Sequence, residues 1–412
     1  MVKGTSGAEI VIVGDEVVSG QVVDTNSAFI ARSLKGIGLE THRVVRVRDD
    51  ESEIKRAVAS ALVSSRLVFV CGGLGVTPDD RTLNAVSELL ERKLIVHKPS
   101  LDRIKTFFER QGYRIQELAK RHALVPAGAR VFENPVGMVP GMVVEHQNST
   151  ICLLPGVPQE LSAILEQGII PYLKQRFGSE RKYSAVLRTF GLIESRSAPR
   201  VTGIVREYPG VSVGYYPSVA GLDIILSGED EAAVNRCADK LTEVFGERVY
   251  ALKDKGLAEV VGEILRKAHR TLGTAESCTG GLIGDIITGV KGSSDYYLGG
   301  VIAYSNRTKM NVLGVREKTL ARYGAVSSQT VKEMAKGVCA VIGTDCGIAV
   351  SGIAGPGGGT KEKPVGLVYI GVNFREKLWV EKHLFSGTRR VIKERSAYSA
   401  LDLLRRVLLK GL

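Results

Sequence analysis

The 412-residue chain has few cysteines, few aromatic residues and no long hydrophobic run. None of its six cysteines forms a CxxC pair, and no group of histidines and cysteines has the spacing of zinc ligands. We therefore expect neither a disulfide framework nor a structural zinc site. No apolar stretch approaches the roughly 18 residues of a membrane-spanning helix, and the charged, glycine-containing N-terminus does not have a signal-peptide pattern. These absences predict a cytoplasmic protein without a membrane partner.

The charge balance points to small anionic ligands. The net charge is +12, but Lys and Arg are spread along the chain and only 6% of the residues are aromatic. Nucleic-acid interfaces combine clustered basic residues with exposed aromatics, so this pattern favours a basic surface that attracts anionic small molecules. The length is comfortable for two or three domains.

The first part of the chain alternates strand-like and helix-like segments. "AEIVIVGDE" and "RLVFVCGG" are apolar runs that end in polar turns, at Gly14 and Gly72, and helical patterns follow. This alternation predicts a doubly wound parallel sheet, whose ligands bind at the carboxyl ends of the strands. The proline- and glycine-rich segment 130–161 is interpreted as an irregular extension with two short strands. A further helix ends near Phe177, and "GSERKY" is a candidate linker.

The remaining chain divides into two α-and-β parts. Three strand-like segments and one helix predict a small α+β module, with no obvious chemistry. From about Lys253, apolar residues at helical spacing and further apolar strands predict an α/β domain. We expect the fold class to be α/β, with a doubly wound first domain at 1–178, a small linking module at 179–252 and a last domain at 253–412.

The stretch "TLGTAESCTGGLIGDII" predicts a turn from a strand to a helix. Ser277 and Cys278 are both able to act as nucleophiles there, and the two glycines let the backbone approach a ligand closely. Amides at such a helix start stabilise an oxyanion. The alternative is an ordinary helix start, capped by Ser277 or Thr279.

Three further motifs strengthen the case for a site in the last domain. "AYSNRTK" places Tyr304 and Lys309 just past an apolar strand, and a lysine near a serine acts as its base once burial lowers its pKa. "SGIAGPGGGTKEKPVG" contains a glycine-rich loop suited to phosphate. "FSGTRR" sets Arg389 at a strand end, where it either binds phosphate or is a surface arginine.

Together, "AESCTGG", "AYSNRTK", "GAVS" and "SGIAGPGGG…KPVG" resemble the C-terminal domain of the CinA family. The resemblance implies a nicotinamide mononucleotide deamidase that needs no cofactor. It implies that Ser277 is the nucleophile, Lys309 its base and Tyr304 an assisting group. The amides near Thr279, Gly280 and Gly281 would form the oxyanion hole, and Gly355 and Arg389 would contact the substrate. Thr388 stands where the family has an acidic residue. Cys278 is the rival nucleophile, although no histidine lies near a matching motif.

Two motifs of the first domain also suit a ligand site. "GDEVVSGQVVDTN" and "GGLGVTPDD" supply carboxylates, an amide and a glycine-rich turn: Glu16, Asp24, Asn26, Gly73, Gly75, Thr77, Asp79 and Asp80. Glycine amides bind anionic oxygens and paired carboxylates hold a divalent cation, so the pattern predicts a phosphate and metal site. The alternative is turn and cap chemistry, above all for Asp24 and Asp80.

These motifs, with "NPVG…PG" and "LLPGVPQEL", are similar to the N-terminal, molybdopterin-binding-like domain of the same family. The resemblance implies a metal-dependent ADP-ribose pyrophosphatase that gives AMP and ribose 5-phosphate. Asp79 and Asp80 would be metal ligands or water activators for a divalent cation (Mg, Mn, Co or Ni), with Glu16, Asp24 and Asn26 around the substrate. Val76 and Met138 depart from the family pattern.

The leading interpretation is a bifunctional, homodimeric enzyme of pyridine-nucleotide salvage that acts on nicotinamide mononucleotide and ADP-ribose. Two alternatives stay open. The first domain binds a pterin or nucleotide without hydrolysis, or the protein is a competence or DNA-damage accessory factor that acts by contact.

Overall fold

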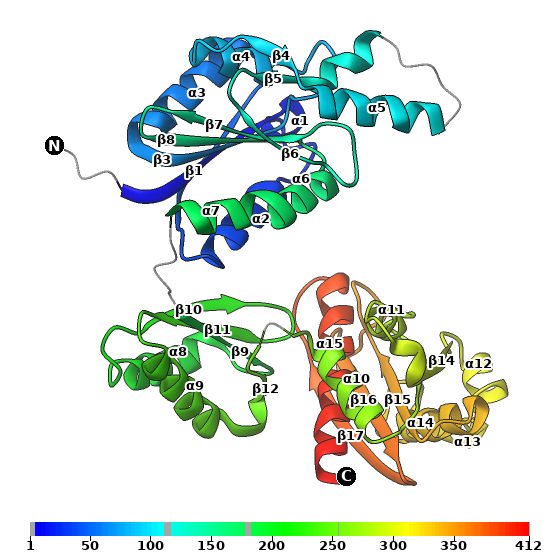
Figure 1. Ribbon diagram of the computed structural model, residues 1–412. Helices are drawn as coiled ribbons and strands as arrows, with labels where there is room; N and C mark the ends of the chain where they lie inside the picture. The colour runs from blue at the N-terminus through cyan, green and yellow to red at the C-terminus, as the bar shows by residue number, and fades with distance from the viewer. Residues whose placement is uncertain (1–4, 111–116, 178–182, 254, 412) are drawn as a thin grey trace. The chain divides into compact units, whose positions relative to one another are not determined.

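The structure is a computed structural model that describes residues 5–110, 117–177, 183–253 and 255–411. The chain forms two compact units, Met1–Lys182 and Tyr183–Leu412 (Figure 1). The predicted linker "GSERKY" lies, except for its last residue, outside the described residues.

A six-stranded sheet forms the centre of the first unit. Its order is β2-β1-β3-β8-β7-β6, with parallel pairing from β2 to β8 and an antiparallel edge of β7 and β6. The strands are β1 (Thr5–Val13), β2 (Thr41–Val47), β3 (Ser65–Cys71), β6 (Arg130–Phe132), β7 (Gly141–His146) and β8 (Ser149–Leu154). Alternate residues of β1 enter opposite cores, Ile10 on one face and Val11 on the other.

Helices cover both faces of this sheet (Figure 1). Helices α2, α6 and α7 pack on one face, and α3 and α4 on the other. The helices are α1 (Asp15–Val18), α2 (Asn26–Lys35), α3 (Glu51–Ser64), α4 (Thr82–Leu89), α5 (Lys98–Arg110), α6 (Pro158–Ile164) and α7 (Ile170–Phe177). A separate antiparallel pair, β4 (Leu94–Val96) and β5 (Leu124–Pro126), lies near α5.

The doubly wound fold is confirmed, but the interpretation of 130–161 as an irregular extension is wrong. That segment supplies three of the six strands, and β8 is a central strand parallel to β3. Turn residues dominate the segment because β7 and β8 are short and joined by a tight hairpin. β8 brings Pro155 and Gly156 to the same sheet edge as the ends of β1 and β3.

The second unit begins with a four-stranded antiparallel sheet of order β10-β11-β9-β12. Its elements are β9 (Tyr183–Thr189), α8 (Glu194–Val205), β10 (Ser212–Pro217), β11 (Leu222–Gly228), α9 (Glu231–Phe245) and β12 (Val249–Ala251). This β-α-β-β-α-β arrangement is a split βαβ module. The sequence analysis found its first three strands and α9 but missed α8 and β12.

A five-stranded sheet of order β14-β13-β15-β16-β17 completes the second unit. Its elements are α10 (Leu257–Lys267), β13 (Leu272–Glu276), α11 (Leu282–Thr288), β14 (Tyr297–Ile302), α12 (Asn306–Asn311), α13 (Glu317–Tyr323), α14 (Ser328–Ile342), β15 (Cys346–Gly352), β16 (Leu367–Phe374), β17 (Lys377–Leu384) and α15 (Arg389–Gly411). Helices α10, α11 and α15 pack on one face and α14 on the other.

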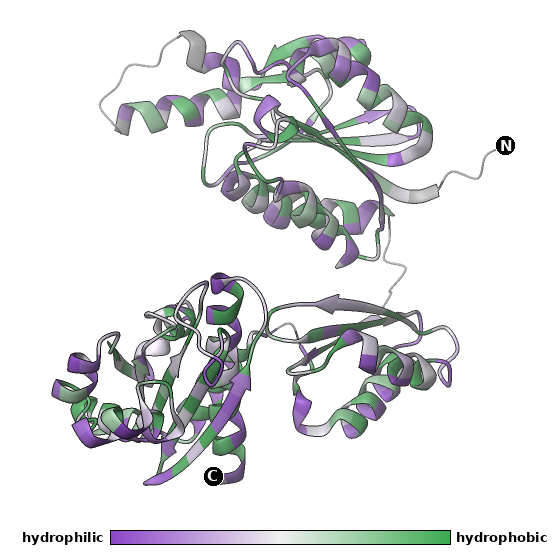
Figure 2. Cartoon of the chain, turned by 180° about the vertical axis from the view of Figure 1, so that it is seen from behind, coloured by the Kyte–Doolittle hydropathy of each residue, from purple (hydrophilic) through white to green (hydrophobic). Residues whose placement is uncertain are grey.

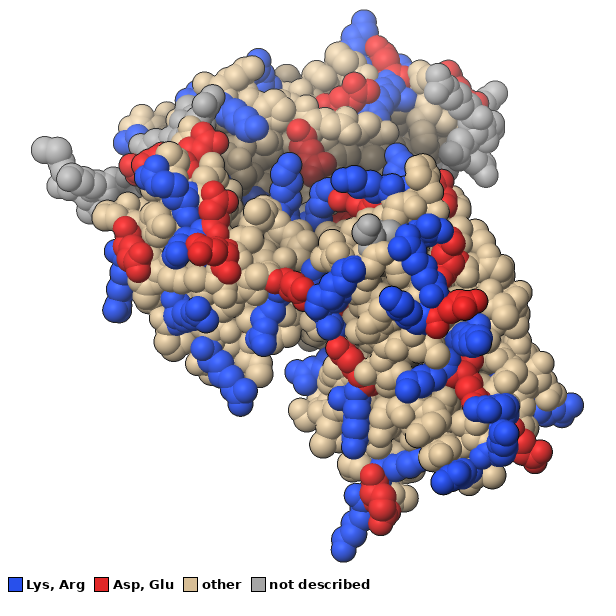
Figure 3. All heavy atoms as spheres, turned by 90° about the horizontal axis from the view of Figure 1, so that it is seen from below, with Lys and Arg blue, Asp and Glu red and all other residues tan. Residues whose placement is uncertain are grey.

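Hydrophobic residues are concentrated in the central strands of each unit, and the outer helices carry hydrophilic residues (Figure 2). Lys and Arg are scattered over the face shown in Figure 3, with Asp and Glu between them. Within the described residues, no helix combines the length and the apolar character needed to cross a membrane.

Candidate active sites

The turn between β13 and α11 is held by a buried carboxylate. Glu276 is 2% exposed. Its Oε2 accepts the amides of Gly281 (2.9 Å) and Ile283 (3.1 Å), and its Oε1 accepts that of Gly284 (2.9 Å). Gly281 occupies the N-cap position with a φ of 95°, a left-handed conformation that favours glycine. The helix start is therefore capped by Glu276, and neither Ser277 nor Thr279 is its N-cap.

Ser277 and Lys309 form a buried pair beside this turn. Nζ of Lys309 lies 3.0 Å from Oγ of Ser277, 2.7 Å from the carbonyl oxygen of Ala303 and 3.3 Å from that of Tyr304. Helix α12 sets the lysine in place, because Ser305 caps its first turn by accepting the amide of Thr308. The lysine is 1% exposed.

The surroundings of Lys309 favour the neutral amine. Burial lowers the pKa of Lys309. When protonated, Nζ donates its three hydrogens to Ser277, Ala303 and Tyr304. When neutral, it keeps two donors for the two carbonyls, and its lone pair faces the Ser277 hydroxyl, which then donates to Nζ.

One cavity of about 260 Å³ collects most of the predicted residues of this domain. Ser277, Lys309, Tyr304, Gly355 and Arg389 all line it. The Arg389 guanidinium spans its rim, donating to the Gly355 carbonyl (2.7 Å) and to the Tyr304 hydroxyl (3.3 Å). The Tyr304 side chain is 65% exposed, so its backbone carbonyl, not its hydroxyl, contacts Lys309.

Three predicted substrate contacts lie outside this lining: Thr279, Gly280 and Gly281. The prediction that the Gly281 amide helps to form an oxyanion hole is wrong, because that amide donates to Glu276. Thr279 is fully buried, and its Oγ1 has no hydrogen-bond partner among the described residues. Cys278 does line the cavity, next to Ser277.

The environment of Cys278 makes it a weaker candidate nucleophile than Ser277. Burial raises the pKa of the Cys278 thiol to about 12, so the thiol stays protonated at neutral pH.

Lys393 was missed by the sequence analysis. A Cβ built on Gly280 would lie 3.6 Å from its Nζ, and no described residue forms a hydrogen bond or ion pair with it. Lys393 lies one helical turn after Arg389, so the two side chains share a helix face, and this spacing was the signal in the sequence that could have found it.

The first unit has its own cavity, of about 550 Å³, at the carboxyl ends of β1, β2, β3 and β8. The predicted residues that line it are Glu16, Gly73, Gly75, Asp79 and Asp80. A Cβ on Gly73 would meet Thr82 Oγ1 at 2.4 Å, and one on Gly75 would meet Asp80 Oδ2 at 2.4 Å. A side chain at either position would therefore displace Thr82 or Asp80, and Gly73 also has a φ of 63°, a left-handed conformation that favours glycine.

Three other predicted residues of the first unit do not line the cavity. Asp24 accepts the amide and the hydroxyl of Ser27 and pairs with Arg46 at 3.2 Å, so its placement around the substrate is wrong and the cap alternative holds. Asn26 donates to the carbonyl of Gly156 (2.7 Å), a residue that does line the cavity. Thr77 donates its amide and hydroxyl to Asp80, and so fixes that carboxylate in place.

The sequence analysis missed three titratable residues of this cavity: Asp49, His122 and Glu160. Burial raises the pKa of the Asp49 carboxyl, and the nearby charges of Asp15, Glu16 and Asp79 raise it further, against a hydrogen bond from the Asp15 amide. Burial lowers the pKa of His122, whose Nδ1 is buried without a hydrogen-bond partner in the described chain. Asp49 is the second residue after β2, so a search for carboxylates just past the carboxyl ends of the strands was able to find it.

The donor set of this cavity fits a divalent cation in part. Its carboxylates are hard oxygen donors, and burial, with the charges of Asp15, Glu16 and Asp79 added to it, raises the pKa of Asp49. Among the described residues, however, no group of three or more His, Cys, Asp or Glu side chains is arranged to hold a metal ion. Cations such as Mg²⁺ bind through one or two carboxylates together with phosphate oxygens, so Asp79 and Asp80 are the residues that would hold one here.

The fold and the two cavities define a two-unit α/β protein that has an acidic, glycine-lined cavity in one unit and a buried serine–lysine pair in the other. Residues 9–175 match the "Probable molybdopterin binding domain" family, and residues 254–408 match the "CinA C-terminal domain" family. The chain belongs to the CinA family, as its motifs indicated.

Similar proteins extend over the whole chain. A "CinA-like protein" of Kosmotoga olearia is 37% identical over 98% of this chain and 99% of its own length. A "Putative competence-damage inducible protein" of Caldanaerobacter subterraneus is 39% identical over 97% of this chain and 98% of its own. Among solved structures, a CinA superfamily protein from Klebsiella pneumoniae is 33% identical, with a TM-score of 0.37, and covers 38% of this chain and 99% of its own.

Proposed function

We propose that the last domain hydrolyses nicotinamide mononucleotide to nicotinate mononucleotide and ammonia. The observation that carries this proposal is the 3.0 Å approach of Lys309 Nζ to Ser277 Oγ inside a cavity. A buried lysine with a lowered pKa is able to deprotonate a serine hydroxyl at a pH where an exposed lysine is not.

In the first step, Ser277 Oγ attacks the carboxamide carbon while neutral Lys309 takes the hydroxyl proton. The carbonyl oxygen becomes an oxyanion, and we propose that the amide of Cys278, the residue directly after the nucleophile, donates to it. Lys393 adds positive charge near the same turn. The C–N bond then breaks, Lys309 returns its proton to the departing nitrogen, and ammonia leaves an acyl-serine.

In the second step, water attacks the acyl-serine. Lys309 takes a proton from the water, the ester bond breaks, and the proton returns to Ser277 Oγ. The products are the original enzyme and a carboxylic acid, which ionises to the carboxylate while the released ammonia takes up the proton as ammonium, so one water is consumed for each ammonia released.

The other end of the cavity suits the substrate phosphate. The loop at Gly355–Gly358 and the Arg389 guanidinium line it together. Backbone amides and a fork of guanidinium donors are the groups that hold a phosphate monoester. We therefore expect the phosphate to contribute most of the discrimination between the mononucleotide and its nucleoside.

The test is incubation of the full chain with nicotinamide mononucleotide, with ammonia and nicotinate mononucleotide both quantified. Equal amounts of the two products are expected, and nicotinamide riboside, which lacks the phosphate, should react at least tenfold more slowly at low concentration. Absence of ammonia would reject the deamidase proposal.

We further propose that the first unit hydrolyses ADP-ribose to AMP and ribose 5-phosphate. The backbone around Gly73 and Gly75 faces the cavity and is suited to phosphate oxygens. Asp79 and Asp80 would hold a divalent cation, which when bound neutralises the pyrophosphate and polarises a water. Both substrates derive from NAD, so the two activities would serve one salvage route, and we propose a cytoplasmic homodimer for it.

This second activity is tested by quantifying AMP from ADP-ribose with Mg²⁺ and with excess EDTA. Activity that needs Mg²⁺ and falls at least about a hundredfold in Asp79→Asn is expected. Glu88→Gln, a surface carboxylate of α4 paired with Lys55, is the matched control and should retain activity. Binding of ADP-ribose without hydrolysis would favour the alternative of a binding module.

A further inference from the structure

A second cavity, of about 410 Å³, lies in the first unit between α5 and the segment after β6. Figure 1 shows α5 beside that segment. Most of the residues that line it are apolar, among them Ile104 and Phe107. Ile104 is 1% exposed, whereas Phe107 is 45% exposed.

This apolar cavity adjoins the acidic cavity. Met138 lines both of them. The shared wall is fixed by buried Asn134, whose Oδ1 accepts the amides of Val136 (3.0 Å) and Gly137 (2.8 Å). Its Nδ2 donates to the Val139 carbonyl (2.8 Å) and to Glu160 Oε2 (2.6 Å), and Glu160 lines the acidic cavity. The two cavities are therefore neighbours that share Met138, an arrangement suited to a ligand with two chemically different ends.

The polar groups of the apolar cavity stand at its edge. His97 Nδ1 and Ser100 Oγ are 2.8 Å apart, and Arg103 pairs with Glu133 at 3.0 Å. Ligand sites for heterocycles combine a mainly apolar wall and an aromatic side chain with a few such polar groups, in volumes from about 300 Å³ upward. A planar base gains from stacking on Phe107, whereas a sugar phosphate does not.

We propose that the apolar cavity binds the purine base of a nucleotide whose phosphate lies in the acidic cavity. The inference rests on the proposed nucleotide substrate of the first unit, and it assigns one end of that substrate to each cavity. The adenosine end occupies the cavity of Phe107 and Ile104, and the ribose 5-phosphate end stays on the side of Asp79.

The test measures binding of the two product halves, so it does not depend on hydrolysis. The full chain with Mg²⁺ is titrated in a calorimeter with AMP and, separately, with ribose 5-phosphate. Phe107→Ala should weaken AMP binding at least fivefold and leave ribose 5-phosphate binding unchanged. Phe107→Tyr keeps an aromatic ring and should bind AMP as tightly as the wild type does. Val63→Ala, an exposed apolar side chain that lines neither cavity, is the control and should bind AMP as the wild type does.

Undetectable AMP binding to the wild type, or equal AMP binding by wild type and Phe107→Ala, would overturn the inference. Equal weakening of AMP and ribose 5-phosphate would also overturn it, because Phe107 would then support the whole unit rather than the base. AMP binding that depends on Phe107 in a protein that hydrolyses no ADP-ribose would reject the proposed hydrolysis and retain the base site.

Discussion

Lys309 is the residue whose ionisation the deamidase proposal depends on. Its Nζ faces one hydroxyl and two carbonyls, an environment that burial makes costly for an ammonium. The sequence indicated a lysine near a serine, but it was unable to give the burial that lowers the pKa, because burial depends on how α12 packs beside the Ser277 turn and the end of β14.

The first prediction concerns pH. Because the neutral amine is the base, kcat/KM for ammonia release should rise with pH through the lowered pKa of Lys309, and so level off at a lower pH than that of an exposed lysine. Lys309→Met should lower kcat/KM at least about a hundredfold and remove the rising limb of the pH–rate profile. The pH–rate profiles of both proteins check it, and an unchanged limb in Lys309→Met would assign the limb to another group.

The same shift has a defined sign for stability. The unfolded chain keeps the lysine proton up to its ordinary pKa, whereas the folded chain loses it at a lower pH. Between these two values the unfolded state binds more protons, so the contribution of Lys309 to the free energy of unfolding rises with pH across that window.

Glu276 gives the second prediction. In Glu276→Gln, one carboxylate oxygen becomes an amide nitrogen that faces backbone N–H groups. We expect the free energy of unfolding to fall by about 2 kcal/mol, since bonds to a buried charged acceptor are lost. Urea denaturation measures it. Glu259→Gln is the control, because Glu259 caps α10 through the single amide of Gly256 and that contact is exposed. Equal losses in the two variants would contradict the special role of Glu276.

Helix α15 carries two cations one turn apart, Arg389 at the cavity rim and Lys393 near Gly280. The sequence analysis singled out Arg389 but placed it at a strand end, whereas it is the first residue of α15. It missed Lys393 because the partner, the 277–281 turn, lies more than 100 residues away and is brought close only by the packing of α11 on α15.

The third prediction concerns this helix. Lys393→Met should lower kcat/KM for ammonia release on the order of tenfold, because a positive charge near the developing oxyanion is removed. Lys393→Arg should retain most of the activity. Arg390→Met removes a charge of the same sign that pairs with Glu394, and should leave the rate unchanged. Equal effects of Lys393→Met and Arg390→Met would indicate a general charge effect instead.

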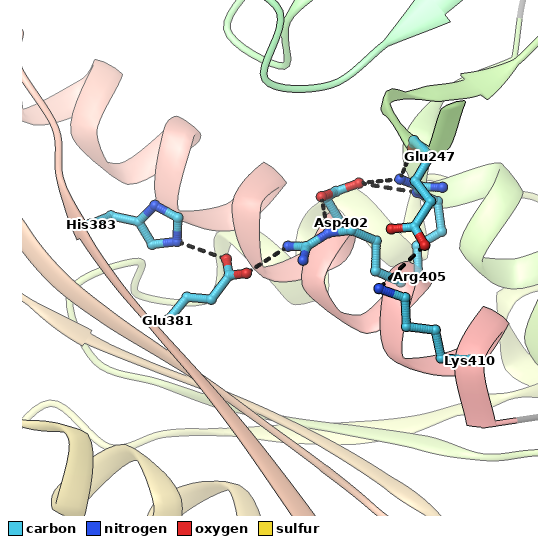
Figure 4. A network of polar contacts seen from close by, with 7 residues as sticks. Glu247, Glu381, His383, Asp402, Arg405 and Lys410 are labelled. Carbon is cyan, nitrogen blue, oxygen red and sulfur yellow. Dashed lines mark hydrogen bonds and ion pairs between the residues drawn. The ribbon is translucent and has the colours of Figure 1, made fainter. Parts of the chain in front are cut away.

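The whole chain consists of the first unit, the small α+β module that begins the second unit, and the last domain. The module contacts the last domain through a polar network at the end of α15 (Figure 4). Buried Arg405 donates to the Glu247 carbonyl (2.6 Å) and to Asp402 Oδ1 (2.7 Å), and Lys410 pairs with Glu247 at 3.2 Å. These contacts join segments far apart in sequence, which is why composition alone described the module only as a linking piece.

The fourth prediction follows from this division. A fragment of residues 183–412 should keep ammonia release within about twofold of the full chain, because the serine–lysine site lies wholly inside that compact unit. A fragment that begins at residue 253 should lose about 1–3 kcal/mol of unfolding free energy, because Arg405 loses an acceptor. Urea melts and ammonia assays of both fragments check it, and loss of activity in 183–412 would show that the first unit contributes to the site.

The alternation of strands and helices was sufficient to predict the doubly wound fold, and the motifs were sufficient to predict the serine, the lysine and the glycine turns. The acidic cavity was only half predicted. Glu160 follows β8 in the segment that looked irregular in sequence, and His122 comes from a 3₁₀ turn at Glu117–Ala123 that the sequence did not predict.

The most direct test of the central claim compares ammonia release from nicotinamide mononucleotide by wild type, Ser277→Ala and Cys278→Ala, side by side. The proposed mechanism predicts release by wild type and Cys278→Ala and at least about a thousandfold loss in Ser277→Ala. Loss in Cys278→Ala with full activity in Ser277→Ala would make the thiol the nucleophile and contradict the serine–lysine mechanism.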